Sequence, residues 1–232
     1  MREGQEDGIS FVDGAKGTLR DNDIFGNGFA GVAVGDGSAP SVTANRIHHG
    51  VSKRRGQQFA WRRTAPLRER RVRPHELSLP PPHPRTPSPS RTCVGRQSGI
   101  YCYSRGGGVF QDNEVYSNAL SNVEVASYAT PTLVANSITE GEQAGVFFHD
   151  GGAGALRLNR IYRNRESGVT LRDAASAPHI ERNSIEENGN VGVRVFGASG
   201  ALHRNRIVGN ARSGVVIEPH SRCVPSIADA RV

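Results

Sequence analysis

A motif of about 23 residues recurs along the chain and limits its fold more than any other feature. Each copy starts with a small residue and continues as a short apolar alternation, as in residues 31–34 (GVAV). The copies start at Gly8, Gly31, Gly99, Asn122, Gly145, Gly168, Gly192 and Gly214. Neighbouring starts are 22 to 24 residues apart, except for the 68 residues between Gly31 and Gly99. A fixed period of this length indicates a solenoid built from stacked coils.

Two further positions repeat with the same period. An Asn is followed two residues later by Ile or Val, and an apolar residue lies three positions before it. The Asn residues are Asn22, Asn45, Asn113, Asn136, Asn159, Asn183 and Asn205, and the apolar residues are Leu19, Val42, Phe110, Leu133, Leu156, Ile180 and Leu202. Each period therefore holds three β-type stretches, too short to pair with one another. They can pair with their equivalents in the next coil, which predicts an all-β fold: a right-handed, single-stranded parallel β-helix of about eight coils, a pectate-lyase-like solenoid.

The repeated Asn residues predict a structural ladder. Coils stacked at about 4.8 Å bring equivalent side-chain amides within hydrogen-bonding distance of each other. A weaker second column consists of Asn27, Asn118, Asn164, Asn188 and Asn210. Five residues before each ladder Asn, Gly and Pro alternate in the order Gly17, Pro40, Gly108, Pro131, Gly154, Pro178 and Gly200. This alternation predicts that coils are paired in units of about 46 residues.

The long interval between Gly31 and Gly99 divides the chain. It predicts coils in 1–50, an insertion in 51–95, further coils in 96–218 and a tail in 219–232. The insertion holds 11 basic and 2 acidic residues, whereas the remainder holds 18 basic and 20 acidic ones. The insertion therefore carries more positive charge than the whole chain, whose formal charge is +7, and the remainder is slightly acidic, so we expect the coils to have no nucleic-acid partner.

Three interpretations of residues 51–95 remain open. A long disordered loop costs a solenoid little, and an Arg-rich arm could bind a polyanion. We favour a third hypothesis, that the segment is translated intron. It begins with Val51-Ser52, a dipeptide that a common splice-donor sequence can encode, and the flanking coils rejoin in register without it.

Other sequence features bear on the compartment. Three cysteines cannot form a secreted disulfide framework, and no two of them have the spacing of a zinc half-site. The first residues do not resemble a signal peptide, and no apolar run approaches the ~18 residues that span a bilayer. The sequence thus predicts a cytoplasmic or nuclear protein that binds no membrane.

The coils resemble a known family. Residues 21–27 (DNDIFGN), 30–34 (AGVAV) and 45–50 (NRIHHG), with the pair Ala39-Pro40, are similar to the carbohydrate-binding and sugar-hydrolase type of β-helix repeat in F-box-only proteins. The resemblance covers roughly residues 8–50 and 96–218. It implies a platform that presents substrate proteins to a cullin-type ubiquitin ligase. Only seven residues precede Gly8, so we expect a fragment or a stand-alone relative that lacks the F-box.

The outward positions offer little for catalysis. Enzymes on this scaffold need clustered carboxylates, but the column from Ser10 to Val216 holds one acid, Glu124. A further column contains Asp13, Asp36, Asp150 and Asp173. These residues suit either tight turns, which we favour, or a calcium ion. His149-Asp150 matches only half of the Asp-Pro-His-Asp motif of alginate epimerases. We therefore expect a non-enzymatic protein without metal or cofactor.

A binding strip has more support in the sequence. Aromatic and Arg residues of the kind enriched at binding hot spots fall on neighbouring outward columns. The strip consists of Tyr101, Tyr103, Phe147, His149, Thr170, Arg172 and Arg194. Simple stacking of these rings along the sheet is the alternative. The sequence therefore favours a platform for a protein substrate or adaptor, with a carbohydrate-binding or polysaccharide-modifying β-helix as the alternative.

Overall fold

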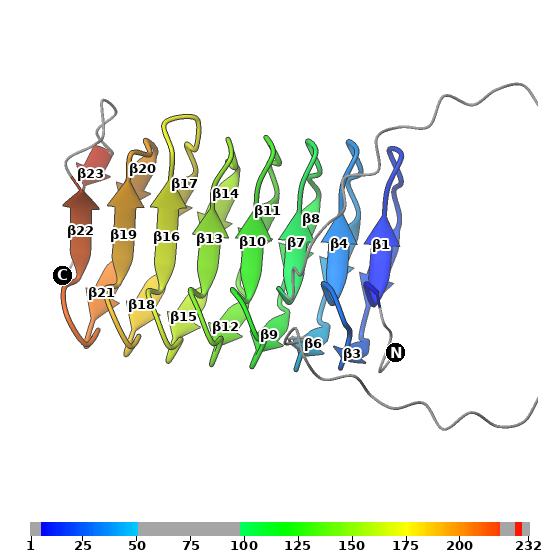
Figure 1. Cartoon of the computed structure of the whole chain (residues 1–232), viewed down its shortest axis with the longest axis horizontal. Coiled ribbons are helices and arrows are strands. Elements are labelled where there is room, and N and C mark those ends of the chain that lie inside the picture. The colour runs from blue at the N-terminus through cyan, green and yellow to red at the C-terminus, as the bar shows by residue number, and fades with distance from the viewer. Residues whose placement is uncertain (1–5, 51–97, 219–225, 229–232) are drawn as a thin grey trace, which may run out of the picture. The chain divides into compact units, whose positions relative to one another are not determined.

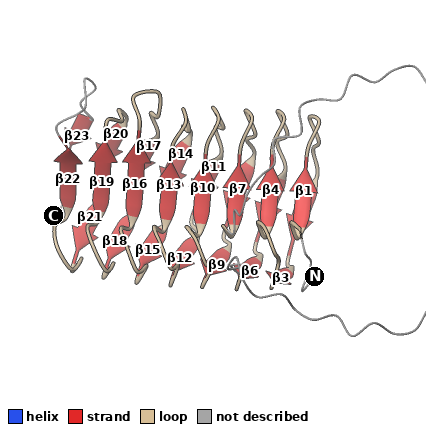
Figure 2. Ribbon diagram, viewed as in Figure 1, coloured by secondary structure: helices blue, strands red, loops and turns tan. Residues whose placement is uncertain are grey.

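The described part of the chain consists of short stacked strands and the turns that join them. The computed structural model describes residues 6–50, 98–218 and 226–228. Its 23 strands, each of three or four residues, form three parallel sheets of eight, eight and seven strands. The chain visits the three sheets in turn, so each coil contributes one strand to each sheet (Figures 1 and 2). The predicted parallel β-helix with coils of about 23 residues is confirmed.

The strands of each sheet follow the repeat. The first sheet contains β1 (Ile9–Phe11), β4 (Val32–Val34), β7 (Ile100–Cys102), β10 (Val123–Val125), β13 (Val146–Phe148), β16 (Val169–Arg172), β19 (Val193–Phe196) and β22 (Val215–Glu218). The second contains β2 (Thr18–Arg20), β5 (Ser41–Thr43), β8 (Val109–Gln111), β11 (Thr132–Val134), β14 (Ala155–Arg157), β17 (His179–Glu181), β20 (Ala201–His203) and β23 (Ser226–Ala228). The third contains β3 (Asp23–Phe25), β6 (Arg46–His48), β9 (Glu114–Tyr116), β12 (Ser137–Thr139), β15 (Arg160–Tyr162), β18 (Ser184–Glu186) and β21 (Arg206–Val208).

The register continues across the 68-residue interval. β4 pairs with β7, β5 with β8 and β6 with β9, and Val32 is aligned with Ile100. The predicted insertion, 51–95, lies outside the described residues, as does most of the predicted tail, 219–232. Its interpretation as translated intron stays a prediction.

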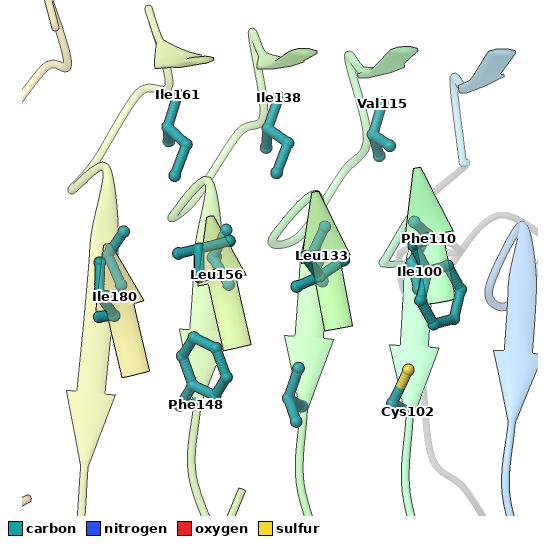
Figure 3. Close-up of a cluster of buried hydrophobic side chains, with 14 of the residues drawn as sticks. Ile100, Cys102, Phe110, Val115, Leu133, Ile138, Phe148, Leu156, Ile161 and Ile180 are labelled. Carbon is teal, nitrogen blue, oxygen red and sulfur yellow. The ribbon is translucent and has the colours of Figure 1, made fainter. Parts of the chain in front are cut away.

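The core is a narrow column of aliphatic side chains. In the coils between the two ends, the central residue of the second-sheet and third-sheet strands points inward, and each first-sheet strand contributes its first and third residues. Phe110, Leu133, Ile138 and Leu156, all fully buried, illustrate this arrangement in Figure 3. Each side chain packs on its equivalent one coil away, which explains how a chain with only 6% aromatic residues fills its core.

The repeated Asn residues form a hydrogen-bonded ladder inside the coils. The backbone N–H and the side-chain Nδ2 of Asn113 both donate to Oδ1 of Asn136, at 3.0 and 2.9 Å. Asn136 in turn donates to Oδ1 of Asn159 and to the carbonyl of Phe110, each through Nδ2 at 2.9 Å. The same pattern runs from Asn22 to Asn205. The ladder thus ties the bend after every second-sheet strand to the next coil.

The Gly and Pro alternation has a steric cause. Gly108, Gly154 and Gly200 have φ of 97°, 100° and 124°. A Cβ on Gly154 would overlap the carbonyl oxygen of Pro131, its counterpart in the preceding coil. Gly108 and Gly200 meet Pro40 and Pro178 in the same way. The Gly of one coil lies against the backbone of the preceding Pro, which accounts for the two-coil unit.

Two exceptions to the repeat compensate each other. Gly141 occupies a position of the second Asn column, and Asn122 occupies a position of the Gly column. The side chain of Asn122 lies beside Gly141 and restores the missing bonds. It accepts from Nδ2 of Asn118 at 2.8 Å and donates to Oδ1 of Asn164 at 2.9 Å. A Cβ on Gly141 would lie 2.8 Å from Nδ2 of Asn122.

Exchanging these two residues should therefore preserve stability. We expect Asn122→Gly alone to lower the free energy of unfolding by about 2 kcal/mol, because buried polar groups lose their partner. Gly141→Asn alone should cost about 1–3 kcal/mol through overpacking. The double variant should return to within about 1 kcal/mol of the parent, since neighbouring sites couple. Urea unfolding of all four proteins measures this, and additive losses would refute the compensation.

Candidate functional site

The predicted binding strip lies on the outer face of the first sheet. Tyr101, Phe147, Thr170 and Arg194 occupy one row, in which Glu124 stands between Tyr101 and Phe147. Tyr103, His149 and Arg172 lie two positions further along their coils. Side chains alternate between the two faces of a strand, so this placement follows directly from the register.

The two tyrosines lie in a different environment from the rest of the strip. The Tyr101 and Tyr103 rings stack on each other, with centroids 4.9 Å apart and planes 12° from parallel. They belong to a small apolar cluster with Ala30, Ala33 and Ala126, in which Tyr101 is only 7% exposed. Neither tyrosine lines the two hollows that the rest of the strip surrounds. This end of the strip is packed in the manner of the stacking alternative.

The other five residues surround two adjoining hollows. The first, which we term the Phe147 hollow, has a volume of about 380 Å³. Its walls include Phe147, Thr170, Arg172, Arg194, Phe196 and Glu218. Nη2 of Arg194 lies 2.6 Å from Oε1 of Glu218, which fixes the guanidinium along one wall. Two aromatic side chains and two guanidinium groups therefore line one cavity.

The second hollow, which we term the His149 hollow, has a volume of about 400 Å³. It is lined by Tyr128, His149, Asp150, Gly151, Arg172, Asp173, Ala174 and Ala175. Arg172 lines both hollows and is exposed. No carboxylate in the described part of the chain forms an ion pair with it. Its charge is thus available to a ligand in either hollow.

A buried carboxylate orients the imidazole of His149. Nε2 of His149 lies 2.9 Å from Oε1 of Glu124, and Oγ of Ser98 donates to Oε2 at 2.7 Å. The ring of His149 stacks on Phe147 with centroids 4.5 Å apart. His149 and Glu124 together resemble the proton-transfer groups of enzymes, in which a carboxylate orients an imidazole. The sequence marks Glu124 as the single acid of its column, but its contacts with His149 and Ser98 join neighbouring coils and leave no signal in the repeat.

The four column aspartates lie in turns or bends, and the side chain of Asp173 caps one of them. Asp13, Asp36, Asp150 and Asp173 all have left-handed backbone conformations, with φ between 51° and 67°. Asp173 accepts from the backbone N–H of Ala175 and from Oγ of Ser176, each at 3.2 Å. Within the described ranges, no three His, Cys, Asp or Glu residues are grouped as a metal site. These contacts are those of the turn interpretation.

Cys102 is a candidate nucleophile only by residue type. Its side chain is fully buried in the core, and burial raises the pKa of its thiol far above the ordinary range. It therefore stays protonated and inaccessible.

Comparison with known proteins identifies the family of the chain. A sequence family described as "Right handed beta helix region" matches residues 91–225. The chain belongs to this right-handed β-helix family. Among the described residues, no α-helix has the length and apolarity needed to cross a membrane.

Two solved structures are similar to this β-helix. One is a crystal structure of the periplasmic alginate epimerase AlgG, with 14% sequence identity and a TM-score of 0.62. The other is a point mutant of that enzyme, with 14% identity and a TM-score of 0.60. Each comparison covers 97% of this chain and 47% of the epimerase, so the chain spans about half its length. This similarity shows a shared fold. No curated protein sequence matches the chain significantly.

Proposed function

We propose that the outer face of the first sheet binds an acidic polysaccharide, with the sugar chain lying across the Phe147 and His149 hollows. The observation that carries the proposal is Arg172, an exposed guanidinium without an ion pair among the described residues that lines both hollows. A guanidinium recognises a carboxylate through two parallel hydrogen bonds, which suits a uronate sugar.

The surroundings of Arg172 support a sugar ligand. Phe147 and Phe196 offer apolar surface to the non-polar face of a sugar ring, while Thr170 and Glu166 line the same hollow and can bond its hydroxyls. The solved structures with a similar fold are those of an epimerase of alginate, which agrees with a carbohydrate ligand. The protein-recognition role implied by the resemblance to F-box-only proteins has no support in these comparisons.

The His149 hollow also suits proton transfer on a bound sugar. The imidazole of His149 is held by Glu124 and lines the same hollow as Arg172. Arg172 would neutralise the carboxylate of a bound uronate, and His149 beside it would act as the base that removes the proton from the carbon next to that carboxylate. The experiment that tests binding should therefore also follow the composition of the polysaccharide.

Calorimetric titration of the purified chain with oligouronates and with neutral glucans tests the proposal. We expect binding of the oligouronates alone, weakened by added salt because the contact is ionic. Arg172→Ala should reduce affinity about 10-fold or more, the value of one charge-assisted hydrogen-bonded pair. Arg157→Ala is the matched control, since Arg157 is also exposed but lies on the second sheet. Equal binding of neutral glucans, or equal affinities of the two variants, would refute the proposal.

A further inference from the structure

A pair of consecutive histidines lies on the outer side of the third sheet. His48 ends β6, and His49 follows in a left-handed conformation with φ of 51°. This conformation is uncommon for residues other than Gly. Instead of pointing to opposite sides as neighbours in a strand do, the two rings approach each other, with centroids 4.9 Å apart and planes at 82°.

The ring of His48 is held on three sides. It stacks between Phe25 and Tyr116, with centroid distances of 5.2 and 4.5 Å. Its Nε2 lies 2.8 Å from Oδ1 of Asp23. A carboxylate accepts hydrogen bonds, so Nε2 carries the hydrogen and the lone pair of the neutral ring is on Nδ1. That Nδ1 is directed toward His49, and the two Nδ1 atoms are 2.6 Å apart.

The separation of the two nitrogens matches a particular coordination geometry. Two ligand nitrogens at about 2.0 Å from a metal and at right angles to each other lie about 2.8 Å apart, whereas a tetrahedral angle places them about 3.3 Å apart. Right angles are typical of the tetragonal sites of Cu²⁺ and Ni²⁺. His49 is exposed and can open the observed distance by the small amount required.

We propose that His48 and His49 bind a Cu²⁺ or Ni²⁺ ion through their Nδ1 atoms. Asp23 orients His48 from behind, the carboxylate–histidine–metal arrangement that recurs in metalloproteins. The described residues group no third His, Cys, Asp or Glu here, so water completes the coordination. The ion displaces the proton shared between the two nitrogens, and affinity therefore falls as the pH is lowered.

Titration of the full chain with Cu²⁺ and with Ni²⁺ near neutral pH, followed by calorimetry, tests the site. We expect one equivalent to be lost in His49→Ala and retained in His203→Ala, a matched exposed histidine on the second sheet. Asp23→Asn should weaken binding by about 10- to 100-fold, the usual effect of removing an outer carboxylate. The electron paramagnetic resonance spectrum of the Cu²⁺ form should show coupling to two nitrogens and lose it in His49→Ala.

Two results would overturn this proposal. If His49→Ala and His203→Ala bind the metals like the parent chain, the close nitrogens merely share a proton. If His49→Ala loses binding while Asp23→Asn binds as tightly as the parent, the orienting role of Asp23 is wrong. Circular dichroism of each variant checks that the coils remain folded. The outcome does not depend on polysaccharide binding, which concerns a different sheet.

Discussion

Replacing Asn136 by alanine is expected to lower the free energy of unfolding by about 3 kcal/mol or more. Asn136 is 2% exposed and lies in the middle of the ladder. Its loss removes the acceptor of two donors on Asn113 and the donor to the carbonyl of Phe110. Each buried group left without a partner costs about 1–3 kcal/mol. A native stability of about 5–15 kcal/mol is typical, so the loss should be large in urea or thermal unfolding.

Asn22→Ala provides a control within the same ladder. Asn22 is only half-buried and begins the ladder, and its side chain donates to Asn45 and to the carbonyl of Arg20. Because water can reach that carbonyl, we expect a loss of about 1 kcal/mol. Asn190→Ala, outside both Asn columns, should change stability by about 0.5 kcal/mol or less. Equal losses of unfolding free energy in Asn136→Ala and Asn22→Ala would show that burial does not determine how much each ladder Asn stabilises the fold.

Replacing Gly154 by alanine is the second change for which a large effect is expected. Gly154 has φ of 100°, and an added Cβ would overlap the carbonyl oxygen of Pro131. Unfavourable φ values and overpacking each cost about 1–3 kcal/mol, so the two together should cost about 2–5 kcal/mol. The clash is with backbone of the neighbouring coil, which cannot move away without breaking strand pairing. Chemical unfolding with two probes should show a lower midpoint.

Gly14→Ala separates the two causes. Gly14 also has positive φ, 72°, but nothing lies within 4 Å of an added Cβ. The free energy of unfolding of this variant should therefore fall only by the conformational cost of the positive φ, about 1–2 kcal/mol. If Gly14→Ala and Gly154→Ala are equally destabilised, the contact with Pro131 does not explain the Gly and Pro alternation.

The residues of the candidate site were only partly predictable. The period places Phe147, Thr170 and Arg194 on one outer row, because equivalent positions of successive coils are aligned when the coils stack. The contact between Glu124 and His149 is different, since it joins neighbouring columns on adjacent coils. It depends on the rotamers of both side chains, which a period cannot encode. The period also cannot show which part of the strip is packed, as at the two tyrosines, and which part borders a hollow. That difference depends on the volumes of the neighbouring side chains.

The repeat in the sequence is sufficient to predict the periodic part of the protein: the three sheets, the core residues, the Asn ladder and the two-coil unit. Each depends on one residue type at one position of a coil, and stacking identical coils converts that position into a column. The contacts that break the period become visible only in the packed coils. The exchange of Asn122 and Gly141, the Glu124–His149 pair and the facing nitrogens of His48 and His49 belong to this group. These contacts require distances between particular side chains, and those distances exist only once the coils are packed.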